Sequence, residues 1–221
     1  MPEVIINGPD GRIEGRYHHT AEPNAPLALI LHPHPEQGGS MNSKATYALF
    51  KTFADRGFNT MRFNFRGVGK SEGKFSQGEG ELADAASVLD WMQTYNTNAR
   101  ACWVAGHSFG AWIAMQLLMR RPELDGFIAV STPANSQDFT FLAPCPVSGV
   151  MIHGDQDVIV PKESVIDLAR RLSAQKNIQV EARVVPGASH LFDEKLDQLM
   201  LAAGDYLDHS NAAPKMMPLR A

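Results

Sequence analysis

Residues 102–120, CWVAGHSFGAWIAMQLLMR, decide the fold. The stretch opens on a short apolar run, passes through Gly106-His107-Ser108-Phe109-Gly110, and continues as an amphipathic segment from residue 111. The run predicts a strand over 102–105 and the segment a helix over 111–120. The G-x-S-x-G pattern therefore falls on a strand-to-helix turn. That context makes it informative, because the pattern by itself arises easily by chance.

Ser108 is the candidate nucleophile of this turn. A sharp turn would hold the serine in strained backbone geometry and expose its hydroxyl beyond the sheet. Gly106 and Gly110, each two residues away, would let the neighbouring backbone pack closely. The following helix would point its positive end at an oxyanion formed during acyl transfer. The alternative is a tight turn that carries an ordinary solvated serine.

Outward from this stretch, apolar strand-like runs alternate with helical periodicity. Such alternation predicts an α/β fold whose central sheet is mostly parallel, with about eight strands and helices on both faces. We expect one domain over 1–210 and a flexible tail over 211–221. Only roughly fifteen residues separate the strand predicted over 126–130 from that over 147–153, which leaves little room for a large lid domain. The expected strands cover 4–7, 12–18, 26–32, 58–65, 102–105, 126–130, 147–153 and 180–185, and the expected helices cover 45–53, 81–95, 111–120, 164–172 and 196–207.

A serine nucleophile needs a base, and the base needs an orienting carboxylate. Asp155 and Asp157 both follow the strand predicted over 147–153, at the rim where open α/β sheets place ligands. We favour Asp157 as the acid, because Asp155 can instead stabilise the turn through its own side chain. His190 follows the last predicted strand and precedes the last helix, where the base is expected to arrive. A surface histidine is the alternative at this position.

The loop after the strand at 26–32 carries the candidate oxyanion hole. Its sequence, His32-Pro33-His34-Pro35, leaves the N–H of His34 as the donor, since proline has none. The second donor is the N–H of Phe109, directly after the serine. A metal site is the alternative interpretation of His32, His34 and the His18-His19 pair, but no cysteine or acidic cluster completes a ligand set. His32 can equally be a buried histidine bonded to backbone.

Composition narrows the class of protein further. The formal net charge is −4 over 221 residues, which argues against nucleic-acid partners and against a polybasic membrane anchor. No apolar stretch approaches the ~18 residues of a transmembrane helix, and the N-terminus shows no signal-peptide pattern. Cys102 and Cys145 lie far apart without a CxxC pattern and are expected as buried thiols of a reducing compartment. Together these features predict a cytoplasmic protein.

Five segments resemble bacterial α/β-hydrolases that carry an HPHP loop and are distantly similar to dienelactone hydrolases. They are LILHPHPEQGGSMNSK, MRFNFRGVGKSEG, AGHSFGAW, IHGDQDVIVP and PGASHLF. The resemblance implies a lidless α/β-hydrolase core, a triad of Ser108, Asp157 and His190, no cofactor, and often a homodimer. The chain has Asn64 where many relatives have aspartate, and we expect Asn64 and Arg66 to fix the nearby loop. Dienelactone hydrolases typically use cysteine as nucleophile, so Ser108 argues against that activity.

The sequence thus predicts a serine hydrolase of small acyl esters or thioesters that works through an acyl-enzyme. Two alternatives stay open: a peptidase, and a non-catalytic scaffold of the same fold that binds a small ligand or partner. Fold alone does not establish activity, so the site geometry has to separate them.

Overall fold

The computed structural model describes residues 3–174 and 176–210 as one α/β unit. The sequence prediction of a flexible tail over 211–221 lies outside the described residues. The strands are β1 (Glu3–Gly8), β2 (Gly11–His18), β3 (Leu27–Leu31), β4 (Asn59–Phe63), β5 (Cys102–His107), β6 (Gly126–Val130), β7 (Gly149–Gly154) and β8 (Val180–Val185). The α-helices are α1 (Lys44–Ala54), α2 (Glu79–Tyr95), α3 (Phe109–Leu118), α4 (Lys162–Ser173) and α5 (Leu196–Ser210), with short 3-10 turns η1 (Pro35–Gln37) and η2 (Thr140–Leu142).

The strands form one eight-stranded sheet in the order β1-β2-β4-β3-β5-β6-β7-β8. The β1–β2 and β2–β4 pairs are antiparallel, and every pair from β4–β3 to β7–β8 is parallel. The parallel strands β3 to β7 are buried along their whole length, as expected for strands covered on both faces. The sheet confirms the predicted mostly parallel α/β architecture.

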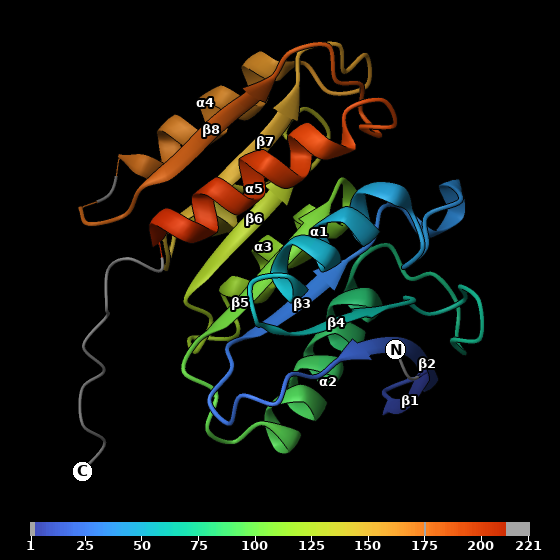
Figure 1. The fold of residues 1–221 in the computed structure, drawn as a ribbon. Helices are drawn as coiled ribbons and strands as arrows, with labels where there is room; N and C mark the ends of the chain where they lie inside the picture. The colour runs from blue at the N-terminus through green and yellow to red at the C-terminus, as the bar shows by residue number, and fades with distance from the viewer. Residues whose placement is uncertain (1–2, 175, 211–221) are drawn as a thin grey trace.

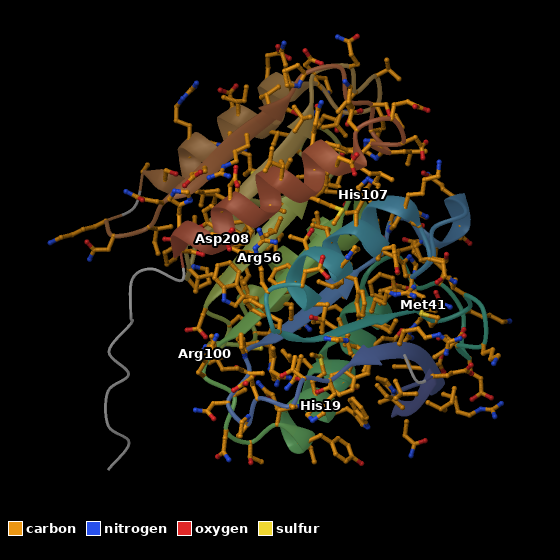
Figure 2. All side chains as sticks on the ribbon, in the orientation of Figure 1. His19, Met41, Arg56, Arg100, His107 and Asp208 are labelled. Atoms are coloured by element: carbon orange, nitrogen blue, oxygen red, sulfur yellow. The ribbon has the colours of Figure 1, made fainter. Side chains whose placement is uncertain are left out.

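Helices cover both faces of the sheet (Figure 1). Residues of α1 and α5 share one buried cluster with one face of the strands, whereas α2, α3 and α4 share the other. Arg56, just after α1, pairs through Nε with Asp208 of α5 at 2.8 Å, and Figure 2 shows the two side chains together. This ion pair ties the two helices of one layer to each other.

Several boundaries differ from the sequence prediction by one to three residues, and two of them affect segments discussed below. Helix α3 starts at Phe109 rather than at residue 111, because Ser108 itself occupies the N-cap position. Strand β7 starts at Gly149 rather than at residue 147. Between β6 and β7 the only regular element is the three-residue turn η2, so this segment forms no large lid.

Because β3 to β8 run in one direction, their carboxyl ends meet along a single edge of the sheet. The loops that leave this edge carry His34, Ser108, Asp157 and His190. In open α/β sheets that edge is where ligands bind. The topology therefore gathers residues that lie more than 150 positions apart in sequence.

Candidate active site

Ser108 occupies a strained turn between β5 and α3. Its φ of 53° and ψ of −117° lie in a region that non-glycine residues rarely adopt. Its N–H donates to the carbonyl of Val130 at 2.8 Å, which fastens the turn to the end of β6. A Cβ at Gly110 would lie 2.5 Å from the carbonyl oxygens of Leu31 and His32, and one at Gly106 would collide with the carbonyl of Gly110. The two glycines thus permit the close backbone approach that the turn requires.

Ser108, His190 and Asp157 form a continuous hydrogen-bonded relay. The Oγ of Ser108 lies 2.9 Å from Nε2 of His190, and Nδ1 of His190 lies 2.7 Å from Oδ2 of Asp157. An ionised carboxylate can only accept, so Nδ1 carries the ring proton and Nε2 of the neutral ring accepts from the serine hydroxyl. The relay has the geometry of a nucleophile, a base and an orienting acid.

The loop after β7 holds the Asp157 carboxylate in place. Its Oδ1 accepts from the N–H groups of Ile159 at 2.8 Å and Val160 at 2.9 Å, and the side chain is fully shielded from solvent. Burial alone would raise the pKa of Asp157, but the hydrogen bonds from His190 and from these N–H groups outweigh it and hold the pKa below its ordinary value. The carboxylate therefore stays ionised beside the His190 ring.

Asp155, the competing aspartate, has a different partner. Its Oδ1 accepts from the N–H of Gly187 at 2.6 Å, which joins the loop after β7 to the loop after β8. The structure thus brings Asp157, and not Asp155, to His190.

The N–H groups of His34 and Phe109 are the candidate oxyanion donors. Phe109 is the first residue of α3, so its N–H has no acceptor within the helix, and the N–H of His34 donates to no acceptor within residues 3–174 and 176–210. The ring centroids of the two residues lie 5.1 Å apart, which places the loop after β3 against the start of α3. Neither N–H group donates to an acceptor in the described part of the chain, and both lie adjacent to the serine turn.

His32 fixes the orientation of the His34 donor. Its Nε2 accepts from the N–H of Phe65 at 3.0 Å, and its Nδ1 lies 2.6 Å from the carbonyl oxygen of Pro33. A trans peptide is planar, so the N–H of His34 points opposite to the Pro33 carbonyl that His32 holds. The alternative of a metal ligand has no support from this geometry, because both ring nitrogens of His32 are engaged by backbone.

Three histidines around the relay are buried: His32, His107 and His153. Burial lowers the pKa of His32 and of His107 to about 4, and it lowers that of His153 as well. Nε2 of His153 lies 2.9 Å from the Val160 carbonyl and 3.5 Å from Oδ2 of Asp157. At neutral pH these rings carry no charge, so Asp157 is not neutralised by a second cation.

Asn64 and Arg66 act on the neighbouring loops, as the sequence predicted. Oδ1 of Asn64 accepts from the N–H of Met41 at 2.9 Å, and its Nδ2 donates to Glu14 at 2.9 Å. Arg66 forms a two-pronged ion pair with Asp84, and both side chains are largely buried. These contacts hold the loop after β4 in place beside the loop that carries His34.

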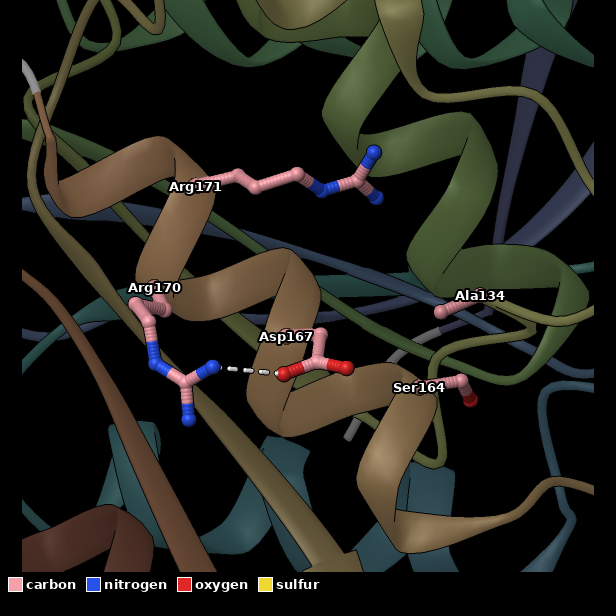
Figure 3. Close-up of a pocket in the computed structure, with 5 residues that line it drawn as sticks. All are labelled: Ala134, Ser164, Asp167, Arg170 and Arg171. Atoms are coloured by element: carbon pink, nitrogen blue, oxygen red, sulfur yellow. Dashed lines mark hydrogen bonds and ion pairs between the residues drawn. The ribbon is translucent and has the colours of Figure 1, made fainter.

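Two surface pockets lie outside the relay, and none of the relay residues lines either of them. One, of about 540 Å³, lies along α4 and is lined by Ala134, Ser164, Asp167, Arg170 and Arg171; its Arg170–Asp167 pair is visible in Figure 3. The other, of about 500 Å³, includes Pro35, Glu36 and Phe75 among its walls. The Phe75 ring lies 4.8 Å from that of His34 and 5.7 Å from that of Phe109. One wall of the second pocket therefore packs near the side chains of His34 and Phe109.

The sequence model of the family described as serine aminopeptidase, S33, matches residues 30–147, just over half of the chain. The chain belongs to this family. An α/β serine hydrolase homologue from Coxiella burnetii has 34% identity and a TM-score of 0.84, with 93% of this chain and 97% of that one covered. A protein of unknown function from Agrobacterium tumefaciens has 52% identity and a TM-score of 0.93, with coverages of 99% and 100%. An uncharacterised protein from Rickettsia prowazekii is 50% identical over 94% of this chain and 89% of its own length.

Membership of this family establishes a hydrolase with the α/β-hydrolase fold, as the sequence predicted. The chain also matches lysophosphatidylserine lipases, such as that of Xenopus tropicalis, at 24% identity over 180 residues. It spans 45% of the length of that protein. Across residues 3–174 and 176–210, no helix combines the length and apolar character needed to cross a bilayer, and no group of three or more His, Cys, Asp or Glu could hold a metal ion.

Sequence reasoning missed the supporting roles of His107, Ser131 and His153. His107 stands inside the G-x-S-x-G pattern and His153 directly precedes Gly154 near the acid, so both positions carried a weak signal. Ser131 carried none, because its place beside His190 depends on how β6 pairs within the sheet.

Proposed function

We propose that this hydrolase cleaves carboxylic esters or thioesters of small acyl groups, with Ser108 as nucleophile, His190 as base and Asp157 as the orienting acid. The observation that carries the proposal is the unbroken relay from Asp157 through His190 to Ser108, with separations of 2.7 and 2.9 Å. A relay of this kind activates a serine hydroxyl that is otherwise a poor nucleophile. No cofactor takes part in the proposed reaction.

The proposed reaction follows from the positions of these groups. His190 takes the hydroxyl proton as Ser108 attacks the acyl carbon, and it then gives that proton to the departing alcohol or thiol. Water, activated by the same ring, attacks the acyl-enzyme and releases the acid. The N–H groups of His34 and Phe109 would donate hydrogen bonds to the acyl oxygen and so stabilise the negative charge that develops on it in both steps.

Labelling with a fluorophosphonate probe tests the nucleophile. We expect the wild type to be labelled and Ser108→Ala not to be. Ser136→Ala is the matched control, since Ser136 is exposed in the loop after β6 and should leave labelling unchanged. Labelling that survives in Ser108→Ala would overturn the assignment, and a wild type that never labels would favour the non-catalytic scaffold.

A substrate panel tests the ester preference. The panel holds nitrophenyl esters of short and long acyl chains, acyl thioesters and a lysophospholipid, since the lipases that the chain resembles carry that substrate in their name. Aminoacyl nitroanilides belong to the same panel, because the family is described as an aminopeptidase family. We expect a burst of nitrophenol from short esters that is absent in His190→Ala; faster turnover of the anilides would favour the peptidase.

We also propose that the enzyme works in the cytoplasm and groups with the HPHP-loop hydrolases that resemble dienelactone hydrolases. Cys102 and Cys145 are both buried and free, which suits a reducing compartment. Fractionation of cells that carry a tagged chain would test the location.

A further inference from the structure

Two buried side chains converge on one backbone carbonyl, that of His190. Nε2 of His107 and Oγ of Ser131 each lie 2.9 Å from the His190 carbonyl oxygen. His107 is the last residue of β5 and Ser131 directly follows β6, so the two donors come from neighbouring strand ends. His107 is 1% exposed and Ser131 is fully buried. We call the pair, together with the carbonyl it holds, the carbonyl clamp.

The protonation of His107 is fixed by its surroundings. Burial lowers the pKa of His107 to about 4, so the ring is neutral at working pH and carries one proton. A carbonyl oxygen can only accept, so that proton sits on Nε2 and points at His190. The other nitrogen, Nδ1, is buried and has no hydrogen-bond partner among residues 3–174 and 176–210. A buried nitrogen without a partner is unfavourable, and an apolar residue at this position would not have one. The contribution that a histidine makes here is therefore the hydrogen-bond donor on Nε2.

Ser131 reaches the carbonyl from a costly backbone conformation. Its φ is 47°, in the left-handed region that favours glycine, and its N–H donates to the carbonyl of Ile152 at 3.0 Å. A glycine would adopt this conformation with less strain but would bring no hydroxyl. The serine therefore combines an awkward backbone position with a hydroxyl aimed at His190.

We propose that His107 and Ser131 are positioning residues that hold the backbone of the catalytic base through its carbonyl oxygen. The proposal rests on the role of His190 given above. His190 lies in the irregular segment between β8 and α5, where no strand or helix fixes its main chain. The clamp supplies that restraint. One of its two donors, His107, is the residue directly before Ser108. Base and nucleophile are thus fastened to the same end of β5.

Fastening the two groups to one strand end has a consequence for catalysis. The ring of His190 must take a proton from Ser108 and then deliver it to the leaving group, while its backbone stays in place. Misplacement of a catalytic group by about 1 Å can cost about a hundredfold in rate. Loss of the clamp should therefore lower kcat and leave KM nearly unchanged, since neither donor is expected to touch the substrate.

Four variants test the clamp on a short nitrophenyl ester. His107→Leu removes the ring donor, and we expect kcat to fall about 10- to 100-fold with KM within about twofold. His107→Gln keeps a donor near the Nε2 position and should recover kcat to within about fivefold of wild type. Ser131→Ala and Ser131→Gly both remove the hydroxyl and should lower kcat about tenfold, although the glycine variant relieves backbone strain.

A second background separates positioning from general damage to the fold. In His190→Ala the base is gone, so adding His107→Leu should not lower the residual rate any further. A further loss there, or failure of His107→Gln to recover activity, would show a structural role and overturn the proposal. Wild-type kcat in His107→Leu or in Ser131→Ala would also overturn it.

The proposed function can fail independently of the clamp. A wild type that the fluorophosphonate probe does not label would refute the serine mechanism. A labelled wild type whose turnover does not depend on the hydroxyl of Ser131 would refute the clamp alone. Should His107→Leu not fold, Ser131→Ala and Ser131→Gly still decide the question, because their small side chains leave the surrounding packing almost unchanged.

Discussion

Lowering the pH from 7 to 5 should destabilise the fold by about 4 kcal/mol, because His32 and His107 are buried as neutral rings. Burial lowers the pKa of each from 6.5 to about 4. Between these two values the unfolded chain binds more protons than the folded one, so stability rises with pH and is lost as the pH falls. Each group changes the free energy of unfolding by about 2 kcal/mol between pH 7 and 5. His153 shifts in the same direction and adds to the loss.

Urea unfolding at the two pH values measures this loss. With a denaturant slope of about 3 kcal/mol per molar, the midpoint should fall by about 1.3 M. His107→Gln carries no titrating ring at that position, so its midpoint should fall by only about half as much. The carboxylate of Asp157, whose pKa is lowered, begins to contribute only at a more acidic pH.

Two results would refute this reasoning. A wild-type midpoint that moves by less than about 0.3 M would mean that the buried rings do not resist protonation. Equal shifts in wild type and His107→Gln would mean that His107 is not among the groups responsible. Because the comparison is between pH values for each variant, a general loss of stability in His107→Gln cancels.

Three further predictions concern the acid, the serine turn and the buried ion pair. Asp157→Asn should lower kcat in the ester assay roughly 10⁴-fold, because the asparagine no longer holds His190 in the correct tautomer. Asp155→Asn keeps an acceptor for the N–H of Gly187, so its kcat should stay within about tenfold of wild type in the same assay. Gly110→Ala should reduce the unfolding free energy by about 3 kcal/mol or more, seen in urea unfolding, because its Cβ would press on backbone oxygens 2.5 Å away. Asp84→Ala should cost about 3 kcal/mol in the same measurement by removing the buried carboxylate partner of Arg66, which is left with the 3.6 Å contact to the more exposed Asp10.

The fold was predictable because its signals are local. The parallel strands β3, β5, β6 and β7 are largely apolar runs, and such runs indicate strands buried on both faces. Strand β4 is buried as well, although it carries Asn59, Thr60 and Arg62. The start of α3 was misplaced by two residues because apolar periodicity emerges only after the first turn of a helix. That first turn begins immediately after Ser108, where its free N–H groups matter most.

The order of Ser108, Asp157 and His190 along the chain was also readable, because the loops after parallel strands share one edge of the sheet. Their supporting contacts were not readable. The hydrogen bond from His107 to the His190 carbonyl spans 83 positions, and that from Ser131 spans 59. No local pattern links such residues, since their contact depends on the pairing of β5 with β6 and on the path of a loop without regular structure.

The three buried histidines, His32, His107 and His153, have the same structural environment. Each stands at the carboxyl end of a parallel strand, stays neutral because burial lowers its pKa, and lies within hydrogen-bond distance of a loop carbonyl. His32 holds the loop that carries His34, His107 the loop that carries His190, and His153 the loop that carries Asp157, through the carbonyls of Pro33, His190 and Val160. Protonation of these rings would put positive charge beside the relay and open the core to water. Accurate placement of the three loops and sensitivity of the fold to acid therefore have the same physical origin.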